Sequence, residues 1–459
     1  MHPLKPFVAA TLTAVAFSST ALSGCASLPP DDGRSGVDQL LADRGLAPPG
    51  PEQSENPKTV ATFTQQTLGK PLTAELAVQL AWLNNPDLRK EFAQLGFSAA
   101  ELYDAGRLAN PVLSAVRLSP GDPAAANAQL SLGIAVSFTD LLLRPARRRF
   151  SAAQFEATQL AVGDAALRFA AAVKTAWYDA VIAGQQAQLW EDSAGAAAAS
   201  AALAQRYFDA GNISQRTLAM EKAAAGSVQA AALLARSDAN AARSHLNRLM
   251  GLSAVQNAWQ LDPHLALPPE AIPPLDALLR QAARQRLDIA SAEQRTRAFA
   301  QRHGLERKTR FIGGIEIGYV REKDFDGFVN KGPSLGLELP LFKRSGRIRA
   351  ARAALALEET ELDRAVLSAS NEVQGAWTTL NAAKERVDLY RQTIIPQRAN
   401  VVARMQEELG YMLIGVFDVL TAKQAEYQAH AEYLDALGDY WRARIELARA
   451  AGGRLPDEA

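Results

Sequence analysis

The sequence predicts a mainly α-helical fold with a small β part, built from a duplicated helix–β-hairpin–long helix–helix unit. The first observation is the stretch Arg344–Leu409, where apolar residues recur at every seventh position and an alanine stands three residues after several of them. That pattern is typical of a helix packed along other helices, and at about 1.5 Å per residue it would reach ~100 Å. The seven-residue series is Val366, Val373, Leu380, Val387, Ile394 and Val401, with Ala369, Ala376 and Ala383 in the seam. The second observation is strict alternation of apolar with small or polar residues in two other regions, which predicts strands.

Composition excludes several classes of protein. The 459 residues carry 49 basic and 49 acidic side chains, so no basic excess argues for a nucleic-acid partner. Outside the N-terminus no run of 18 apolar residues predicts a membrane-spanning helix. The five histidines do not cluster, so we expect no metal site and no cofactor. No nucleophile–base set or phosphate loop is recognisable, and the chain is expected not to be an enzyme.

The N-terminus has the outline of a signal peptide over residues 1–24. Leu22-Ser23-Gly24-Cys25 resembles a bacterial lipobox, which implies that Cys25 is lipidated and becomes the mature N-terminus. The next residue is Ala26. In Gram-negative lipoproteins an aspartate at this position opposes sorting to the outer membrane, so the alanine implies sorting to that membrane. The alternative is an ordinary cleaved signal peptide with a chance cysteine. Residues 25–70, rich in Pro, Gly, Asp and Ser, are predicted to form a lipid-anchored tether, wrapped on the surface or partly disordered.

The first repeat is assigned to residues 71–260 and the second to residues 261–452, followed by a tail at 453–459. Strands are predicted near 111–118 and 128–139 in the first, and near 311–320 and 333–341 in the second. Arg321–Lys331 is interpreted as a charged loop. Long helices follow at Leu143–Phe208 and Arg344–Leu409, each with a return helix. Val173, Ala176 and Trp177 reappear as Val373, Ala376 and Trp377, and Gly211 as Gly410, which indicates a tandem duplication. Both tryptophans are expected to pack, and Pro396 to bend its helix.

Each predicted hairpin has one apolar face and one small, polar face. This suits a barrel wall with lipid outside and water inside, although a hairpin on a soluble core has the same pattern. Four strands cannot close a barrel, so an apolar wall requires pairing between chains, and three chains would supply 12 strands. Glu316 and Glu338 fall on the polar face and are candidate lumen-facing residues.

From about residue 70 to 452 the chain resembles the TolC family of outer-membrane efflux channels. The resemblance rests on Asn85-Pro86-Asp87-Leu88, Leu339-Pro340-Leu341-Phe342, Tyr207-Phe-Asp-Ala-Gly211 and Gly415-Val-Phe-Asp418-Val-Leu420. It implies a homotrimer, with a 12-stranded outer-membrane β-barrel continued by a periplasmic α-helical barrel. It also implies a periplasmic membrane-fusion adaptor at the helical tips and an inner-membrane pump of RND or ABC type.

The family's tips correspond here to Gly211–Gln215 and Gly410–Asp418. Candidate adaptor-contact residues are Gly211, Asn212, Ile213, Gly410 and Gly415. Asp418 is a candidate gate residue or an N-cap of the last helix; Thr421 stands where the family often has a second acid, so a paired acidic constriction is not expected.

The resemblance implies a passive, lipid-anchored exit duct in the outer membrane, opened at its helical tip when the adaptor binds. Drugs, metals, solvents and secreted polypeptides all remain open as cargo. The alternatives are the exit duct of a type I secretion system and a structural periplasmic coiled-coil lipoprotein. A purely periplasmic fibre would not need the apolar strand faces.

Overall fold

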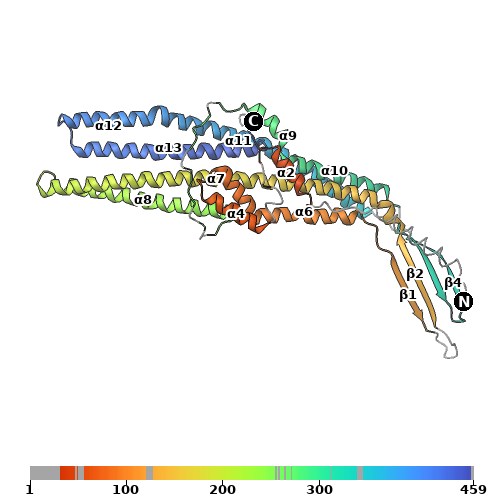
Figure 1. Ribbon diagram of the computed structural model, residues 1–459. Coiled ribbons are helices and arrows are strands. Elements are labelled where there is room, and N and C mark those ends of the chain that lie inside the picture. Colours follow the sequence, from red (N-terminus) through yellow and green to blue (C-terminus); the bar gives the residue numbers. More distant parts are fainter. Residues whose placement is uncertain are drawn as a thin grey trace. The chain divides into compact units, whose positions relative to one another are not determined.

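The computed structural model describes residues 31–46, 49, 56–119, 128–253, 256, 259–262, 265–269, 271–311, 313–338 and 345–455. The predicted signal peptide, Cys25, the Leu339–Phe342 motif and the turn after the first strand fall outside these residues. The chain divides into two compact units (Figure 1). Unit 1 comprises Met1–Arg34, Ala93–Leu160 and Ala290–Arg364; unit 2 comprises Ser35–Phe92, Ala161–Ile289 and Ala365–Ala459. Each unit therefore takes segments from both predicted repeats.

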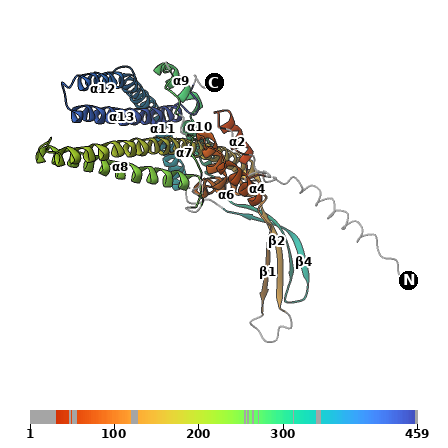
Figure 2. The same cartoon turned by 60° about the vertical axis from the view of Figure 1, so that its left-hand side comes forward.

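Two helical hairpins dominate unit 2. Helix α7 (Phe138–Asp209) is 72 residues long, and α8 (Gln215–Leu249) returns along it. Helix α11 (Ser345–Leu389) leads through a π-helical turn into α12 (Ile395–Gly410), and α13 (Val416–Ala450) returns along α12. Both views show each return helix lying beside its partner (Figures 1 and 2). The predicted long helices are confirmed, with α7 beginning five residues earlier than expected.

The seven-residue pattern of α11 is confirmed by burial in its middle. Val373, Leu380 and Val387 are fully buried in a core with Tyr440 and Leu447 of α13. In contrast, Val366 is 50% and Val401 46% exposed. A seam of this type stabilises a helix only where a neighbour covers it. The single chain therefore covers the middle of the seam and leaves positions near its two ends bare.

The π-helical turn Tyr390–Ile394 immediately precedes Pro396. Proline has no N–H to donate and its ring crowds the preceding turn, so the regular hydrogen-bond ladder cannot continue through it. The Ile395 N–H reaches back to the Tyr390 carbonyl instead, one residue beyond the α-helical partner. Pro396 thus marks the departure from regular helix that its position predicts.

The duplication extends to individual hydrogen bonds. The indole of Trp177 donates to the Leu72 carbonyl at 2.7 Å, and that of Trp377 to the Pro273 carbonyl at 3.0 Å. Both tryptophans belong to apolar clusters, as expected. Gly251 and Gly452 follow the two return helices with φ of +68° and +94°, and each approaches the backbone at the end of a short helix. Those helices are α5 (Ala74–Asn84) and α9 (Leu275–Gln285), which precede α6 (Pro86–Ala105) and α10 (Leu287–Lys308).

Part of the segment predicted to be a tether, residues 25–70, is helical. Helix α2 (Arg34–Ala42) buries Val37 and Leu41, one turn apart. Helix α4 (Pro57–Leu68) begins at Pro57, and the Asn56 side chain caps the Lys58 N–H. The α2 helix is too short to persist alone in water, so its burial explains its formation.

Unit 1 contains an antiparallel sheet in the order β1-β2-β3-β4. The strands are β1 (Val112–Leu118), β2 (Gln129–Ser137), β3 (Ile315–Lys323) and β4 (Val329–Leu337). The second hairpin corrects the predicted Arg321–Lys331 loop, because both strands run into it and leave a turn at Asp324–Phe328. There Gly327 has φ of +88° and its N–H donates to the Asp324 carbonyl. None of the described helices is long and apolar enough to cross a membrane.

Candidate functional site

The turn between α7 and α8 closes on Gly211. Its N–H donates to the Phe208 carbonyl and the next N–H, of Asn212, to the Tyr207 carbonyl. Gly211 has φ of +74°, a conformation that glycine adopts without a Cβ penalty. Ser214 then caps α8 by accepting from the Thr217 N–H. Gly211 and Asn212 are exposed and Ile213 is partly covered, so this predicted contact site is an accessible turn.

The second turn uses a different residue from the one predicted. Gly410 is the last residue of α12, and the left-handed position falls to Met412, with φ of +57°. Met412 donates to the Leu409 carbonyl and Leu413 to the Glu408 carbonyl, which repeats the pattern around Gly211. The structural counterpart of Gly211 is therefore Met412, two residues beyond the Gly410 that residue type matches to it.

The second turn also exposes apolar side chains. Tyr411, Met412 and Leu413 are 77%, 92% and 72% exposed. Beside them the Asp418 carboxylate accepts from the Gly415 N–H at 2.9 Å, which satisfies a free donor at the start of α13. The N-cap position belongs to Gly415, and Asp418 acts from the third helical position. Tyr207 and Phe417 meet edge to face, with ring centroids 6.1 Å apart, so an aromatic pair joins the two tips within one chain.

The strand register sorts the sheet residues onto two faces. Leu113, Ile134, Tyr319 and Pro333 form one cross-strand row, and Val136, Ile317 and Leu335 form the next on the same face. On the other face, Ser114, Gly133 and Val320 share a row, as do Glu316 and Gly336. The apolar side chains are exposed in the single chain, from 41% for Leu132 to 78% for Leu113. Strands β1 and β4 each have only one partner among the described strands.

The two predicted lumen residues lie at the helix end of the polar face. Glu316 is exposed and in register with Gly336. The Glu338 carboxylate accepts from the Gly314 N–H at 2.8 Å, just beyond the end of β4. Glu338 therefore also closes the end of the second hairpin, a role that its sequence position alone does not indicate.

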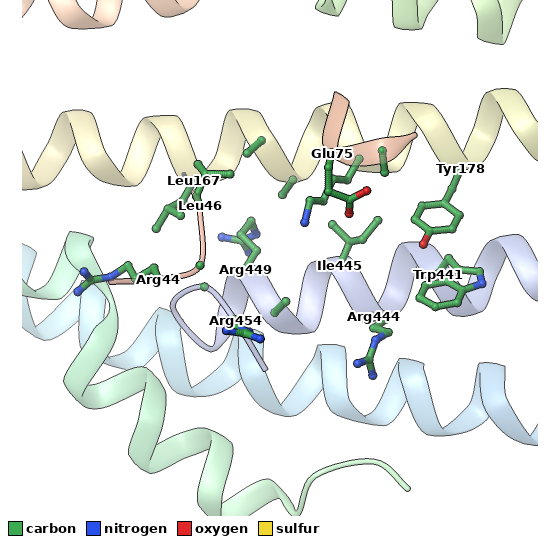
Figure 3. A pocket seen from close by; sticks show the side chains of 17 residues that line it. Arg44, Leu46, Glu75, Leu167, Tyr178, Trp441, Arg444, Ile445, Arg449 and Arg454 are labelled. Atoms are coloured by element: carbon green, nitrogen blue, oxygen red, sulfur yellow. The ribbon is translucent and has the colours of Figure 1, made fainter. Parts of the chain in front are cut away.

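Helices α7 and α13 are joined within unit 2. Tyr178 stacks on Trp441 with ring centroids 4.9 Å apart (Figure 3). Arg442 of α13 bonds Asp179 of α7 at 2.6 Å and Asp439 of its own helix at 2.8 Å. Burial lowers the pKa of Arg442, but its bonds to Asp439 and Asp179 outweigh burial and raise it. The two helical hairpins are thus held together by stacking and by ion pairs.

A cavity of about 480 Å³ lies beside this junction. Its charged lining is mostly basic: Arg44, Lys174, Arg444, Arg449 and Arg454 against a single carboxylate, Glu75. Figure 3 shows Arg44 in the segment after α2, and Arg444 and Arg449 on α13. Glu75 belongs to α5 and Arg454 follows the end of α13. Sequence reasoning did not predict this cavity, because its residues are scattered from position 44 to 454.

An ion network around the buried Arg286 replaces a cap in the second repeat. Asn85 of the first repeat accepts from the Asp87 N–H and donates to the Leu249 carbonyl. Arg286 stands in its place, reaching Asp288 at 2.6 Å and Glu372 at 2.9 Å, and donating to the Ala450 carbonyl. Burial opposes ionisation of Glu372, but bonds from Arg286, Ser368 and Arg449 outweigh it and lower the pKa of Glu372 to about 2.

Comparisons with known proteins agree with this architecture. Residues 278–453 match the family model "Outer membrane efflux protein". The cobalt-zinc-cadmium resistance protein CzcC of Cupriavidus metallidurans is 26% identical over 409 residues, covering 86% of this chain and 93% of that protein.

Solved structures share the fold. A membrane protein from Pseudomonas aeruginosa has a TM-score of 0.71 at 17% identity, covering 83% of this chain and 93% of that one. The outer membrane protein VceC from Vibrio cholerae has a TM-score of 0.69 at 18% identity, with 83% and 96% coverage. The Campylobacter jejuni CmeC outer membrane channel has a TM-score of 0.70 at 15% identity, with 84% and 89% coverage. Residues 278–453 are therefore similar to the outer membrane efflux protein family, and the solved structures show a fold shared along most of this chain.

Proposed function

We propose that the chain is the channel subunit of a tripartite efflux pump, forming a passive exit duct across the periplasm and the outer membrane. The observation that carries this proposal is the sheet of unit 1. It has an exposed apolar face, a second face that is small and polar on β2 and β4, and two strands with an open edge. Open edges and exposed apolar faces are costly in a soluble monomer.

A homotrimer satisfies both features. Strand β4 of one subunit pairs with β1 of the next, and three copies close a barrel of 12 strands. Its apolar face meets outer-membrane lipid, and its polar face, with Glu316 and Glu338, lines the lumen. The half-covered ends of the α11–α12 seam are then covered by neighbouring subunits, which continues the wall as a helical barrel in the periplasm.

The duct is proposed to work without bond chemistry. A periplasmic membrane-fusion adaptor binds the two helical tips, and the exposed Tyr411, Met412 and Leu413 supply apolar contact for it. Opening separates the tips, which breaks the contact between Tyr207 and Phe417. An inner-membrane pump of the RND or ABC type loads the lumen. Lipidation at Cys25 is proposed to anchor the chain in addition to the barrel.

Divalent metal cations are the cargo to test first. The support is the printed name of the CzcC relative, together with the acidic residues on the polar face of the sheet. Deleting the gene should lower tolerance to cobalt, zinc and cadmium if this cargo is right. If metal tolerance is unchanged and tolerance to drugs or solvents is lowered, the cargo is a drug or solvent and the proposed exit duct still stands. If the deletion strain fails to secrete a polypeptide, a type I secretion system is favoured.

The deciding experiment is purification in mild detergent followed by recording in a planar bilayer. The expected result is trimer-sized migration and stepwise ion conductance. A monomer without conductance would contradict the channel and favour the structural coiled-coil lipoprotein.

A further inference from the structure

The charges of the sheet are completely divided between its two faces. Six charged residues occur in the four strands. The register places all of the basic ones, Arg117, Arg321, Lys323 and Lys331, on the apolar face. Both acidic ones, Glu316 and Glu322, fall on the polar face. Successive residues of a strand point to opposite faces, so this division cannot follow from a charged segment alone.

The basic residues also gather at one end of the strands. Arg321 and Lys331 are direct cross-strand partners, and Lys323 lies one same-face position further along β3. Arg117 pairs with Leu130, which in turn pairs with Lys323, so it belongs to the Lys323 row. Both rows lie toward the strand-connecting turns, beyond the Tyr319 row. We call these four residues the basic band.

No member of the basic band has an ion-pair partner within the described part of the chain, and all four side chains are exposed. On the other face, Glu322 is bonded by Gln129, and Asp324, which follows β3 in the turn, is bonded by Asn330. Exposed cations in water need no partner. At the boundary of an apolar face, however, a cation is costly unless water or an anion compensates it.

The position along the strand matches such a boundary. At about 3.3 Å per residue, Arg321 lies ~20 Å along the strand from the first residue of β3. With a strand tilt of about 40° this is roughly 15 Å of height, in the upper part of a lipid-facing apolar belt that is about 25 Å tall with aromatic residues at its margin. Tyr319 occupies that margin on the same face. The basic band therefore occupies the end of the apolar face away from the helices, where its rows also contain Leu130, Leu132 and Val329.

We propose that the basic band binds the phosphate groups of lipids in the outer leaflet of the outer membrane. This inference rests on the proposed function, which puts the helices in the periplasm and so the strand-connecting turns at the cell exterior. An arginine fork binds phosphate through paired donors, and lysines add point charges. In the trimer each subunit contributes one band, so phosphorylated headgroups are held around the whole barrel.

The test compares two lipids on the intact trimer. Wild-type protein is incubated with lipid A carrying both phosphates or with dephosphorylated lipid A, and retained lipid is measured by native mass spectrometry. We expect retention of the phosphorylated form only, falling with added salt. The double variant Arg321→Gln/Lys331→Gln should retain that lipid on the order of tenfold less, from the loss of two surface charges near phosphate. The matched control Arg349→Gln/Arg352→Gln, two exposed cations of α11, should retain it normally.

The outcomes separate this inference from the function. If the wild-type trimer conducts ions but retains both lipids equally, the basic band does not bind lipid phosphate, while the channel function still stands. Equal losses in the double variant and the control also overturn phosphate binding by the basic band. A wild-type protein that neither trimerises nor conducts overturns both. If the double variant does not insert, phosphate binding is still tested on the wild-type protein by comparing the two lipids and by adding salt.

Discussion

At the scale of single residues, the two tips differ in the strain that they store. Met412 adopts a left-handed conformation that its counterpart Gly211 adopts freely. A side chain in that region costs roughly 1–2 kcal/mol, partly offset because glycine gains entropy in the unfolded chain. We expect Met412→Gly to stabilise the tip by about 0.5–1 kcal/mol, and Gly211→Met to destabilise the other tip by about 1 kcal/mol. Hydrogen exchange of the tip amides measures both changes.

The same substitution, Met412→Gly, should weaken adaptor binding although it stabilises the tip. Met412→Gly removes a side chain that is 92% exposed, and with it apolar contact area. A variant with a more stable tip but weaker adaptor binding would support the adaptor role, whereas unchanged binding would remove Met412 from that interface.

The Glu372 network predicts a dependence of stability on pH. The pKa of Glu372 is lowered from 4.5 to about 2, so the unfolded state takes up the proton first as the pH falls. The stabilisation is complete above about pH 4.5 and is lost as the pH falls toward 2. It is on the order of 1 kcal/mol after solvent screening. Thermal unfolding of Glu372→Gln against wild type between pH 7 and pH 3 checks this, and a difference that does not shrink toward pH 3 would contradict it.

Residue roles were only partly predictable from sequence. The matching of Gly211 to Gly410 followed residue type, whereas the backbone aligns Gly211 with Met412, and only the hydrogen bonds reveal this. The capping role of Asp418 was foreseen in kind but not in position. The counterpart relation between Asn85 and Arg286 has no sequence signal, because an amide and a guanidinium of different length reach equivalent carbonyls, those of Leu249 and Ala450.

At the scale of elements, periodicity predicted the long helices and hairpins well because each is long or strictly alternating. It failed where charge suggested a loop. Arg321 and Glu322 alternate across the sheet like the residues before them, so the strand continues through them. Helices α2 and α4 were missed because their stability comes from packing against distant segments.

An arginine introduced on the apolar face of the sheet should impair membrane insertion, whereas an arginine introduced on the polar face should not. Leu337→Arg places a charge on the apolar face in the row nearest the helices, and should cost about 1 kcal/mol in each subunit, because the cost falls toward the margins of the membrane. We expect loss of outer-membrane insertion, measured by fractionation and trimer yield. Ser131→Arg is the matched control, because it lies on the polar face opposite Glu322. Equal insertion of both variants would refute a lipid-facing assignment for Leu337.

At the scale of the whole molecule, the proposed lumen makes ion selectivity measurable. Three copies of Glu316 would add negative charge to one ring of the pore and favour cations. Glu316→Gln should therefore shift the reversal potential in a salt gradient toward lower cation preference. Glu101→Gln, an exposed acid of α6 outside the sheet, should leave the potential unchanged. An unchanged potential in the Glu316 variant would place this side chain away from the ion path.

The open edges of β1 and β4 also have a genetic consequence. If each subunit completes its sheet with the strand of a neighbour, no copy works by itself. One defective subunit is then enough to impair the whole trimer. A cell expressing equal amounts of normal and insertion-defective chains would assemble roughly one fully normal ring in eight by random mixing of three subunits. Defects in these strands should therefore act dominantly, whereas loss of the whole gene copy should be recessive.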